Sequence, residues 1–141
     1  MSRNAIPAPG DPTAIVRAMH EAYIRAAHAG DVKAAQALYA DDVWALWEYE
    51  GDEAYGRAAI DSLIATAFAN MTGLTLVLND VRAARLGDGH LSSVGHWEVT
   101  YNGPDGAPIH IPVRSTEVLV HRNGTWQYMV QHVSQGLPPP G

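Results

Sequence analysis

The stretch "AYIRAAHAGDVKAAQALYADDV" (residues 22–43) decides the order of the N-terminal elements. Gly30 and Asp31 divide it, because glycine is favoured immediately after a helix and aspartate immediately before one. We therefore predict that one helix ends at Gly30 and that a second begins after Asp31. The second helix would carry Ala34, Ala35, Leu38 and Tyr39 on its apolar side, and Asp41 and Asp42 would mark its exit into a strand at 43–49.

On either side of this stretch the pattern stays helical. Asp11-Pro12 is a typical helix start, an N-cap residue followed by proline at the first helical position. Ile15, Met19 and Tyr23 then form an apolar stripe at helical spacing. Residues 51–56 are predicted to form a loop, and residues 57–69 a third helix.

From residue 74 onward the pattern becomes extended. Four long strands are predicted, separated by turns at 87–89, 102–106 and 122–124, which contain the Asp-Gly and Asn-Gly pairs that favour hairpins. Several strands carry apolar residues on both faces, whereas a sheet with helices on one side usually has a polar second face. We therefore expect a second copy of the chain to cover the outer face, giving a homodimer.

Composition limits the classes of function. The chain has 141 residues, enough for one domain, which we expect at 11–135 between a flexible arm (1–10) and a flexible tail (136–141). A formal charge of −6 argues against nucleic acid or an anionic membrane as a partner. The absence of cysteine excludes disulfides and thiolate chemistry, and no metal-ligand motif is present. The N-terminus lacks the apolar core of a signal peptide, so a cytoplasmic location is expected.

Three segments together resemble the NTF2-like superfamily, and within it the SnoaL-like and ketosteroid-isomerase-like small proteins. They are the opening stretch, "GRAAI" (56–60) and the closing "TEVLVHRNGTWQYMVQHVS" (116–134). The resemblance implies an α+β cone, with three N-terminal helices packed on a curved, mostly antiparallel sheet. It also implies a pocket open at one end and often a dimer through the outer sheet face. It says little about the reaction, because the superfamily hosts enzymes as well as binding and assembly domains.

The same resemblance suggests roles for residues of the first helix and first strand. Tyr23 corresponds to a tyrosine that donates a hydrogen bond to a developing oxyanion, although a core tyrosine is an equal alternative. Trp47 occupies the position of the general-base aspartate of the isomerases, so true ketosteroid isomerisation is disfavoured. Glu48 would reach the pocket only through a bulge and is expected at the rim.

The long strands offer further candidates. Trp97 and Tyr101 are expected to line the pocket, with His96 and Glu98 on the other face, although the reverse orientation stays open. Arg114, in mid-strand, would either bind an anionic oxygen in the pocket or pair with an acid outside it. The closing "H-x-S" resembles the end of many SnoaL-like chains, whose histidine faces the cavity. His132 is therefore the first catalytic candidate, although a core histidine is the alternative.

The sequence thus predicts an aromatic-lined pocket for a small, largely apolar molecule. Its predicted wall consists of Trp47, Tyr49, Trp97, Tyr101, Tyr128 and Met129. An enzyme is favoured, a cofactor-free isomerase, cyclase or dehydratase, in which His132 moves the proton and Tyr23 or Arg114 steadies the intermediate. A non-catalytic ligand-binding or assembly domain of the same fold is the alternative.

Overall fold

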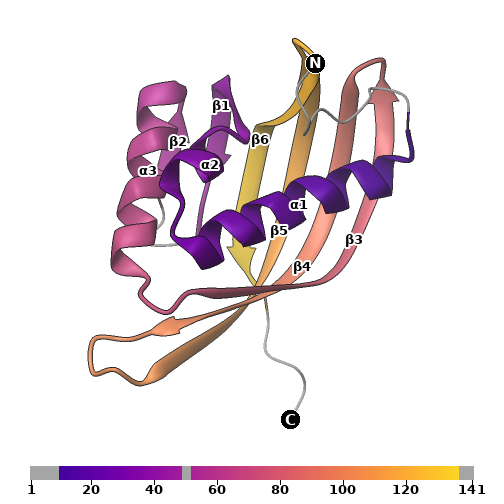
Figure 1. The fold of residues 1–141 in the computed structure, drawn as a ribbon. Helices are drawn as coiled ribbons and strands as arrows, with labels where there is room; N and C mark the ends of the chain where they lie inside the picture. The colour runs from indigo at the N-terminus through magenta and orange to yellow at the C-terminus, as the bar shows by residue number, and fades with distance from the viewer. Residues whose placement is uncertain (1–9, 49–51, 137–141) are drawn as a thin grey trace.

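The computed structural model describes residues 10–48 and 52–136. Three helices and six strands follow one another along the chain (Figure 1). They are α1 (Pro12–Ala29), α2 (Val32–Gln36), β1 (Tyr39–Leu46), β2 (Glu53–Tyr55), α3 (Arg57–Asn70), β3 (Thr75–Gly87), β4 (His90–Asn102), β5 (Pro108–Arg122) and β6 (Thr125–Gln135).

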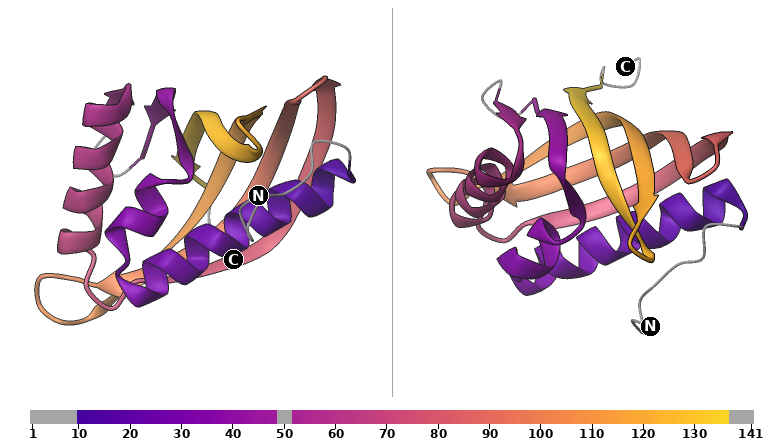
Figure 2. Two further views of the ribbon diagram at one scale, coloured as in Figure 1. Left: turned by 45° about the horizontal axis from the view of Figure 1, so that its top comes forward. Right: turned by 90° about the horizontal axis from the view of Figure 1, so that it is seen from above.

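The six strands form one sheet in the order β2-β1-β6-β5-β4-β3. Every neighbouring pair is antiparallel except β1 and β6, which run parallel. The sheet curves strongly, and α1 crosses one face of it while α3 stands beside β1 and β2 (Figures 1 and 2). The predicted α+β cone with a curved, mostly antiparallel sheet is confirmed.

The ends of α1 follow the expected local chemistry. The Asp11 side chain accepts a hydrogen bond from the Ala14 amide at 2.9 Å, and Pro12 is the first helical residue. At the other end Gly30 has φ = 67°, a left-handed conformation that costs glycine little. The inner side of α1 buries Ile15, Val16 and Met19 in the main core.

Two parts of the expected layout are corrected. The second helix ends at Gln36, so Asp41 and Asp42 lie within β1 and do not form a helix exit. The loop predicted at 51–56 contains the short strand β2, whose Ala54 is paired with Ala45 of β1. The pairing of β1 with β6 is interrupted between Tyr39 and Trp44, and the two aspartates are exposed in this interruption.

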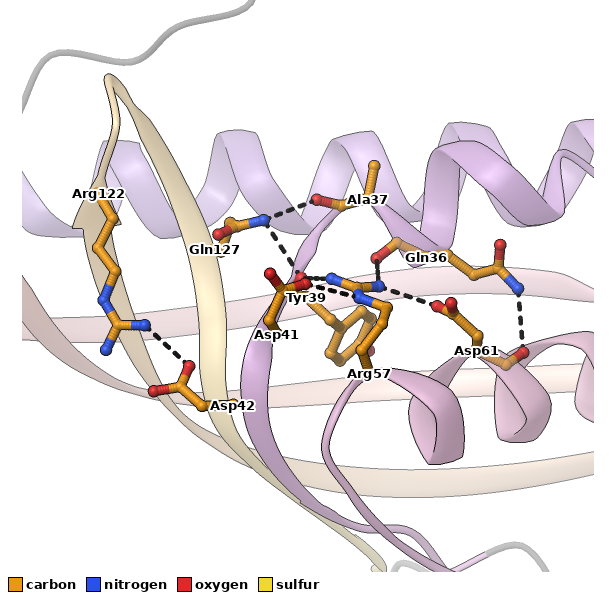
Figure 3. A network of polar contacts seen from close by, with 9 residues as sticks. All are labelled: Gln36, Ala37, Tyr39, Asp41, Asp42, Arg57, Asp61, Arg122 and Gln127. Atoms are coloured by element: carbon orange, nitrogen blue, oxygen red, sulfur yellow. Dashed lines mark hydrogen bonds and ion pairs between the residues drawn. The ribbon is translucent and has the colours of Figure 1, made fainter.

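Arg57, the first residue of α3, ties this irregular part of β1 to two helices (Figure 3). Its guanidinium donates to the carboxylates of Asp41 at 2.9 Å and Asp61 at 2.8 Å. It also donates to two backbone carbonyls, those of Gln36, at 2.9 Å, and Tyr39. One planar cation with several fixed donors can serve all these acceptors, which a lysine could not.

The outer face of the sheet, away from α1, carries large exposed apolar side chains. Trp44 is 63% exposed and Tyr55, its cross-strand partner, 57% exposed. Leu46, Val77 and Val94 are also exposed. The face therefore has the apolar character that the sequence indicated. Among the described residues, no helix is long and apolar enough to cross a membrane.

The Arg57 contacts predict a large effect on stability. Replacing Arg57 with methionine should lower the free energy of unfolding by about 2 kcal/mol, because it removes several charge-assisted hydrogen bonds and leaves two carbonyls short of a donor. Arg122→Met is the matched control, because Arg122 makes one exposed ion pair with Asp42. Urea denaturation of both variants measures the difference. Equal losses in the two variants would contradict the assigned role of Arg57.

Candidate functional site

A cavity lies between the helices and the inner face of the sheet. Its wall is mostly aromatic and aliphatic, with a few polar groups. Helix residues in the wall are His20 and Tyr23 of α1 and Ala67 and Phe68 of α3, followed by Met71 and Leu74. Strand residues and their extensions are Tyr39, Trp47, Glu48, Leu76, Trp97, Val99, Val113, Ser115, Tyr128, Gln131 and Val133. Such a wall suits a small apolar ligand held by a few directional contacts.

A buried carboxylate organises the polar groups at one end of this cavity. Glu117 of β5 is 2% exposed. Ser93 of β4 donates to its Oε1 at 2.8 Å, and Gln131 of β6 donates to its Oε2 at 3.3 Å. Its Oε1 also lies 3.6 Å from Nε2 of His20 on α1. Burial of a charged group is costly unless hydrogen bonds compensate it, and three elements around β5 supply these contacts.

His20 joins Glu117 to the cavity wall. Its ring is 1% exposed, and its Nδ1 lies 2.7 Å from the hydroxyl of Tyr128, which lines the cavity beside it. The ring packs edge-on against Trp97, with centroids 4.7 Å apart. Nε2 faces the Glu117 carboxylate and forms no hydrogen bond within the part of the chain that the structure describes. The negative charge favours the tautomer with its proton on Nε2, and Nδ1 then accepts a hydrogen bond from the Tyr128 hydroxyl.

Gln131 holds two aromatic side chains of the wall in place. Its Oε1 accepts a hydrogen bond from the Tyr39 hydroxyl at 2.6 Å and another from the Trp47 indole at 3.0 Å. Its Nε2 donates to Glu117. The amide therefore links the aromatic wall to the buried carboxylate and fixes the orientation of both tyrosine and tryptophan.

Burial keeps the tyrosines of the cavity in their neutral form. It raises the pKa of Tyr23 and Tyr128 above the usual range, and the negative charge of Glu117 raises the pKa of Tyr128 further. Tyr39 shows the same upward pKa shift, again mainly from burial. Each hydroxyl can therefore donate a hydrogen bond at neutral pH, and none is a resting phenolate.

Four residues predicted to contact the ligand or reaction centre line the cavity: Tyr23, Trp47, Trp97 and Tyr128. Their roles stay predictions. Tyr101 shares the inward parity of Trp97 but lies beyond the cavity wall, and Met129 is also outside it. Tyr49 lies outside the described residues. His96 and Glu98 are on the outer face, where they pair with Asp80 and His110 respectively.

The structure corrects the expected positions of His132 and Arg114, which are both exposed and both outside the cavity wall. The register between β5 and β6 shifts at Met129: Leu119 pairs with Tyr128, whereas Val118 pairs with Val130. One extra residue in a strand moves every later side chain to the opposite face. Gln131 therefore takes the inward position expected for His132. Arg114 follows Val113, which faces inward, so strand alternation alone turns it outward.

Sequence reasoning missed His20 and Glu117. A signal for His20 exists, because it follows Val16 by four residues and precedes Tyr23 by three, which places all three on one face of α1. Glu117 shares the period-two parity of Val113 and Leu119, both buried. Neither signal predicts that His20 and Glu117, which are 97 residues apart in the sequence, lie next to each other in the fold. Among the described residues, no group of three or more His, Asp or Glu is placed to hold a metal ion.

Glycine at position 95 gives Trp97 its place in the wall. A Cβ at Gly95 would come within 2.9 Å of the Trp97 indole nitrogen and 3.1 Å of the Ser115 hydroxyl oxygen. The same two atoms are joined by a hydrogen bond of 2.9 Å. The "G-x-W" segment of β4 therefore needs the glycine because the indole lies over it.

Comparison with known proteins gives a consistent fold. A family model described as the SnoaL-like domain matches residues 16–138. A search of curated proteins finds no match.

Three solved structures illustrate the likeness. A protein from Streptomyces avermitilis, provisionally described as a dehydratase of the NTF2-like family, has 19% identity and a TM-score of 0.81, with 92% of this chain and 100% of that chain covered. An uncharacterised protein with a cystatin-like fold from Caulobacter vibrioides has 20% identity and a TM-score of 0.79, with 92% of each chain covered. Hexachlorocyclohexane dehydrochlorinase LinA-type3 from Novosphingobium barchaimii has 13% identity and a TM-score of 0.75, with 88% and 86% covered. At these identities the likeness concerns the fold alone.

The crowding at residue 95 predicts a defect confined to one wall of the cavity. Gly95→Ala should displace the Trp97 indole, break its bond to Ser115 and lower the free energy of unfolding by about 1–3 kcal/mol. Tryptophan fluorescence and urea denaturation measure the two effects. Gly87→Ala is the matched strand control, because nothing lies within 4 Å of a Cβ there. An unchanged Trp97 environment in Gly95→Ala would contradict the packing described.

Proposed function

The chain belongs to the SnoaL-like domain family, and we propose that it is a cofactor-free enzyme of the isomerase, cyclase or lyase type. The cavity takes a small, largely apolar ligand, and the reaction is a proton transfer. The single observation that carries the proposal is the buried contact series Tyr128–His20–Glu117. Here Tyr128 and His20 line the cavity, and Glu117 stands behind the imidazole.

The proposed transfer starts at a C–H bond of the ligand that is acidified by a neighbouring carbonyl or leaving group. The Tyr128 oxygen takes this proton while its own proton passes to Nδ1 of His20 over the 2.7 Å contact. The electron pair of the broken C–H bond stays on the ligand, where it forms an enolate or expels the leaving group. The transfer is concerted, because the raised pKa of Tyr128 disfavours a free phenolate.

Glu117 and Tyr23 support this step in different ways. The imidazolium formed on His20 faces the Glu117 carboxylate across 3.6 Å, so its charge is balanced in a site of low polarity. Tyr23 lies in the same wall and donates a hydrogen bond to the developing oxygen anion of the ligand. Return of the proton by the same path to another atom of the ligand completes an isomerisation, and expulsion of a leaving group completes an elimination.

We also propose that the chain forms a homodimer through the outer face of the sheet. Two cross-strand rows support this. The first row consists of the paired residues Val118, Val130, Trp44 and Tyr55. The second row consists of Val94, Thr116, His132 and Leu46. An apolar patch of this kind on a soluble domain usually marks an interface. His132 would then serve the interface and not the cavity.

A benzisoxazole that undergoes base-catalysed ring opening tests the acid–base proposal without knowledge of the natural ligand. Purified wild-type protein should open 5-nitrobenzisoxazole faster than buffer, and His20→Gln should lower the rate by about 100-fold. Tyr128→Phe should lower it similarly, because it removes the hydroxyl that joins the probe to His20. Absorbance of the nitrophenolate product measures the rate.

His132→Gln is the matched control for this assay, since it changes a histidine that lies outside the cavity. Its rate should equal that of the wild type. Circular dichroism checks that each variant is folded. If folded His20→Gln and Tyr128→Phe both keep the wild-type rate, or if wild-type protein gives no rate above buffer, the chain is a non-catalytic binding domain.

The dimer proposal predicts a change in mass on a single outer-face substitution. Trp44→Glu should convert a dimer into a monomer, because it places a charge in the centre of the first apolar row. Leu86→Glu, an equally exposed position near the end of β3, should leave the dimer intact. Sedimentation equilibrium distinguishes the two masses. A wild-type protein that sediments as a monomer would refute the proposed interface.

A further inference from the structure

The charges around the cavity all have one sign. Seventeen described residues line it, and none of them is lysine or arginine. Glu48 lines the cavity, and the buried carboxylate of Glu117 lies behind the cavity wall near His20. Arg57 and Arg122 lie outside the wall and pair with Asp41, Asp61 and Asp42. The two carboxylates would therefore repel a ligand with a permanent carboxylate or phosphate and attract a cation.

Glu48 is the charged group that a ligand can reach. It is half-buried, and no described residue forms a hydrogen bond or ion pair with it. Burial raises its pKa above the usual value for a glutamate. A carboxylate that has lost part of its water without a partner among the described residues is stabilised by a cation brought in by the ligand.

The surroundings of Glu48 suit an ammonium group attached to an apolar body. Trp47, the adjacent residue, presents an indole whose N–H is already bound to Gln131, and the rings of Tyr39 and Trp47 lie 6.4 Å apart. Aromatic faces attract cations as well as apolar groups. Phe68, Met71 and Leu74 add apolar side chains to the same wall.

Glu48 and Glu117 stand at different places along the cavity. Glu117 pairs with Gln131, and Gln131 pairs with Ala45 of β1, so these three residues form one row across the sheet. Glu48 follows Ala45 by three residues and lies in a bend just past the end of β1, so the two Cα atoms are at most roughly 10 Å apart. A ligand bound to Glu48 through one end can therefore reach toward His20 with the other.

We propose that the cavity binds a lipophilic amine as its ammonium ion. The ammonium group pairs with Glu48, and a chain or ring of about the length of the cavity places the rest of the molecule against the aromatic wall near His20. Glu48 is thus a specificity-determining residue that selects amines over neutral and anionic molecules of the same shape. This inference rests on the proposed function in taking the same cavity as the substrate site.

Three probes of one shape test the inference in the full-length chain: 4-phenylbutylamine, 4-phenylbutan-1-ol and 4-phenylbutyrate. Their dissociation constants are measured by isothermal titration calorimetry at neutral pH. The amine should bind about five times more tightly than the alcohol, the range expected for a partly exposed ion pair. The carboxylate should bind more weakly than the alcohol. In Glu48→Gln the amine and the alcohol should bind equally, with the alcohol unchanged.

Glu98→Gln is the matched control, because Glu98 lies on the outer face beside His110, and it should keep the wild-type preference. The inference is overturned if the wild type binds amine and alcohol equally, if Glu48→Gln keeps the preference, or if none of the three probes binds. His20→Gln separates this inference from the catalytic one, since it should retain the amine preference while losing turnover of the benzisoxazole. Amine preference in a protein without any turnover would remove only the enzymatic proposal.

Discussion

A single buried carboxylate, that of Glu117, imposes the constraint on which the cavity depends. A charge taken out of water must be compensated by nearby donors, and here β4, β6 and α1 each bring one group toward it. Those groups are Ser93, Gln131 and His20. Two of them also contact the aromatic wall: Gln131 accepts hydrogen bonds from Tyr39 and Trp47, and His20 contacts the Tyr128 hydroxyl. The hydrogen bonds around Glu117 therefore hold the aromatic side chains of the wall in their orientations.

The wall shows how one fold accommodates different chemistry. The resemblance of the sequence to ketosteroid-isomerase-like proteins predicts that Trp47 occupies the position of their aspartate base. The indole cannot accept a proton, but its N–H donates to Gln131, so the position joins the Glu117 network without taking part in proton transfer. In the proposed reaction the acid–base role falls to Tyr128 and to His20 of α1, which lies one turn before Tyr23 in the cavity wall. Function in such folds depends on the site residues and not on the architecture.

The sequence predicted the architecture well and the site less well, for identifiable reasons. Helix caps at Asp11 and Gly30 and the Asn-Gly and Asp-Gly turns are local signals, so the elements and their order could be predicted. The break in β1 and the extra residue at Met129 are not local signals, because they arise from the pairing of β1 and β5 with β6. Because of the extra residue at Met129, Gln131 faces inward where the sequence predicted His132. Val43 and Ala45 are buried on the inner side of β1, and Trp47 continues their alternation. In β4 the same alternation runs through Leu91 and Ser93 to Trp97, so strand periodicity placed both tryptophans in the wall.

The protonation of His20 tests the central claim most directly. Long-range proton–nitrogen correlation spectra of uniformly nitrogen-15-labelled protein at neutral pH report which ring nitrogen carries the proton. The contacts with Glu117 and Tyr128 predict that Nε2 carries a proton and that Nδ1 is the hydrogen-bond acceptor. A proton on Nδ1 with Nε2 unprotonated would contradict the account, because Nδ1 could not then receive the proton of Tyr128.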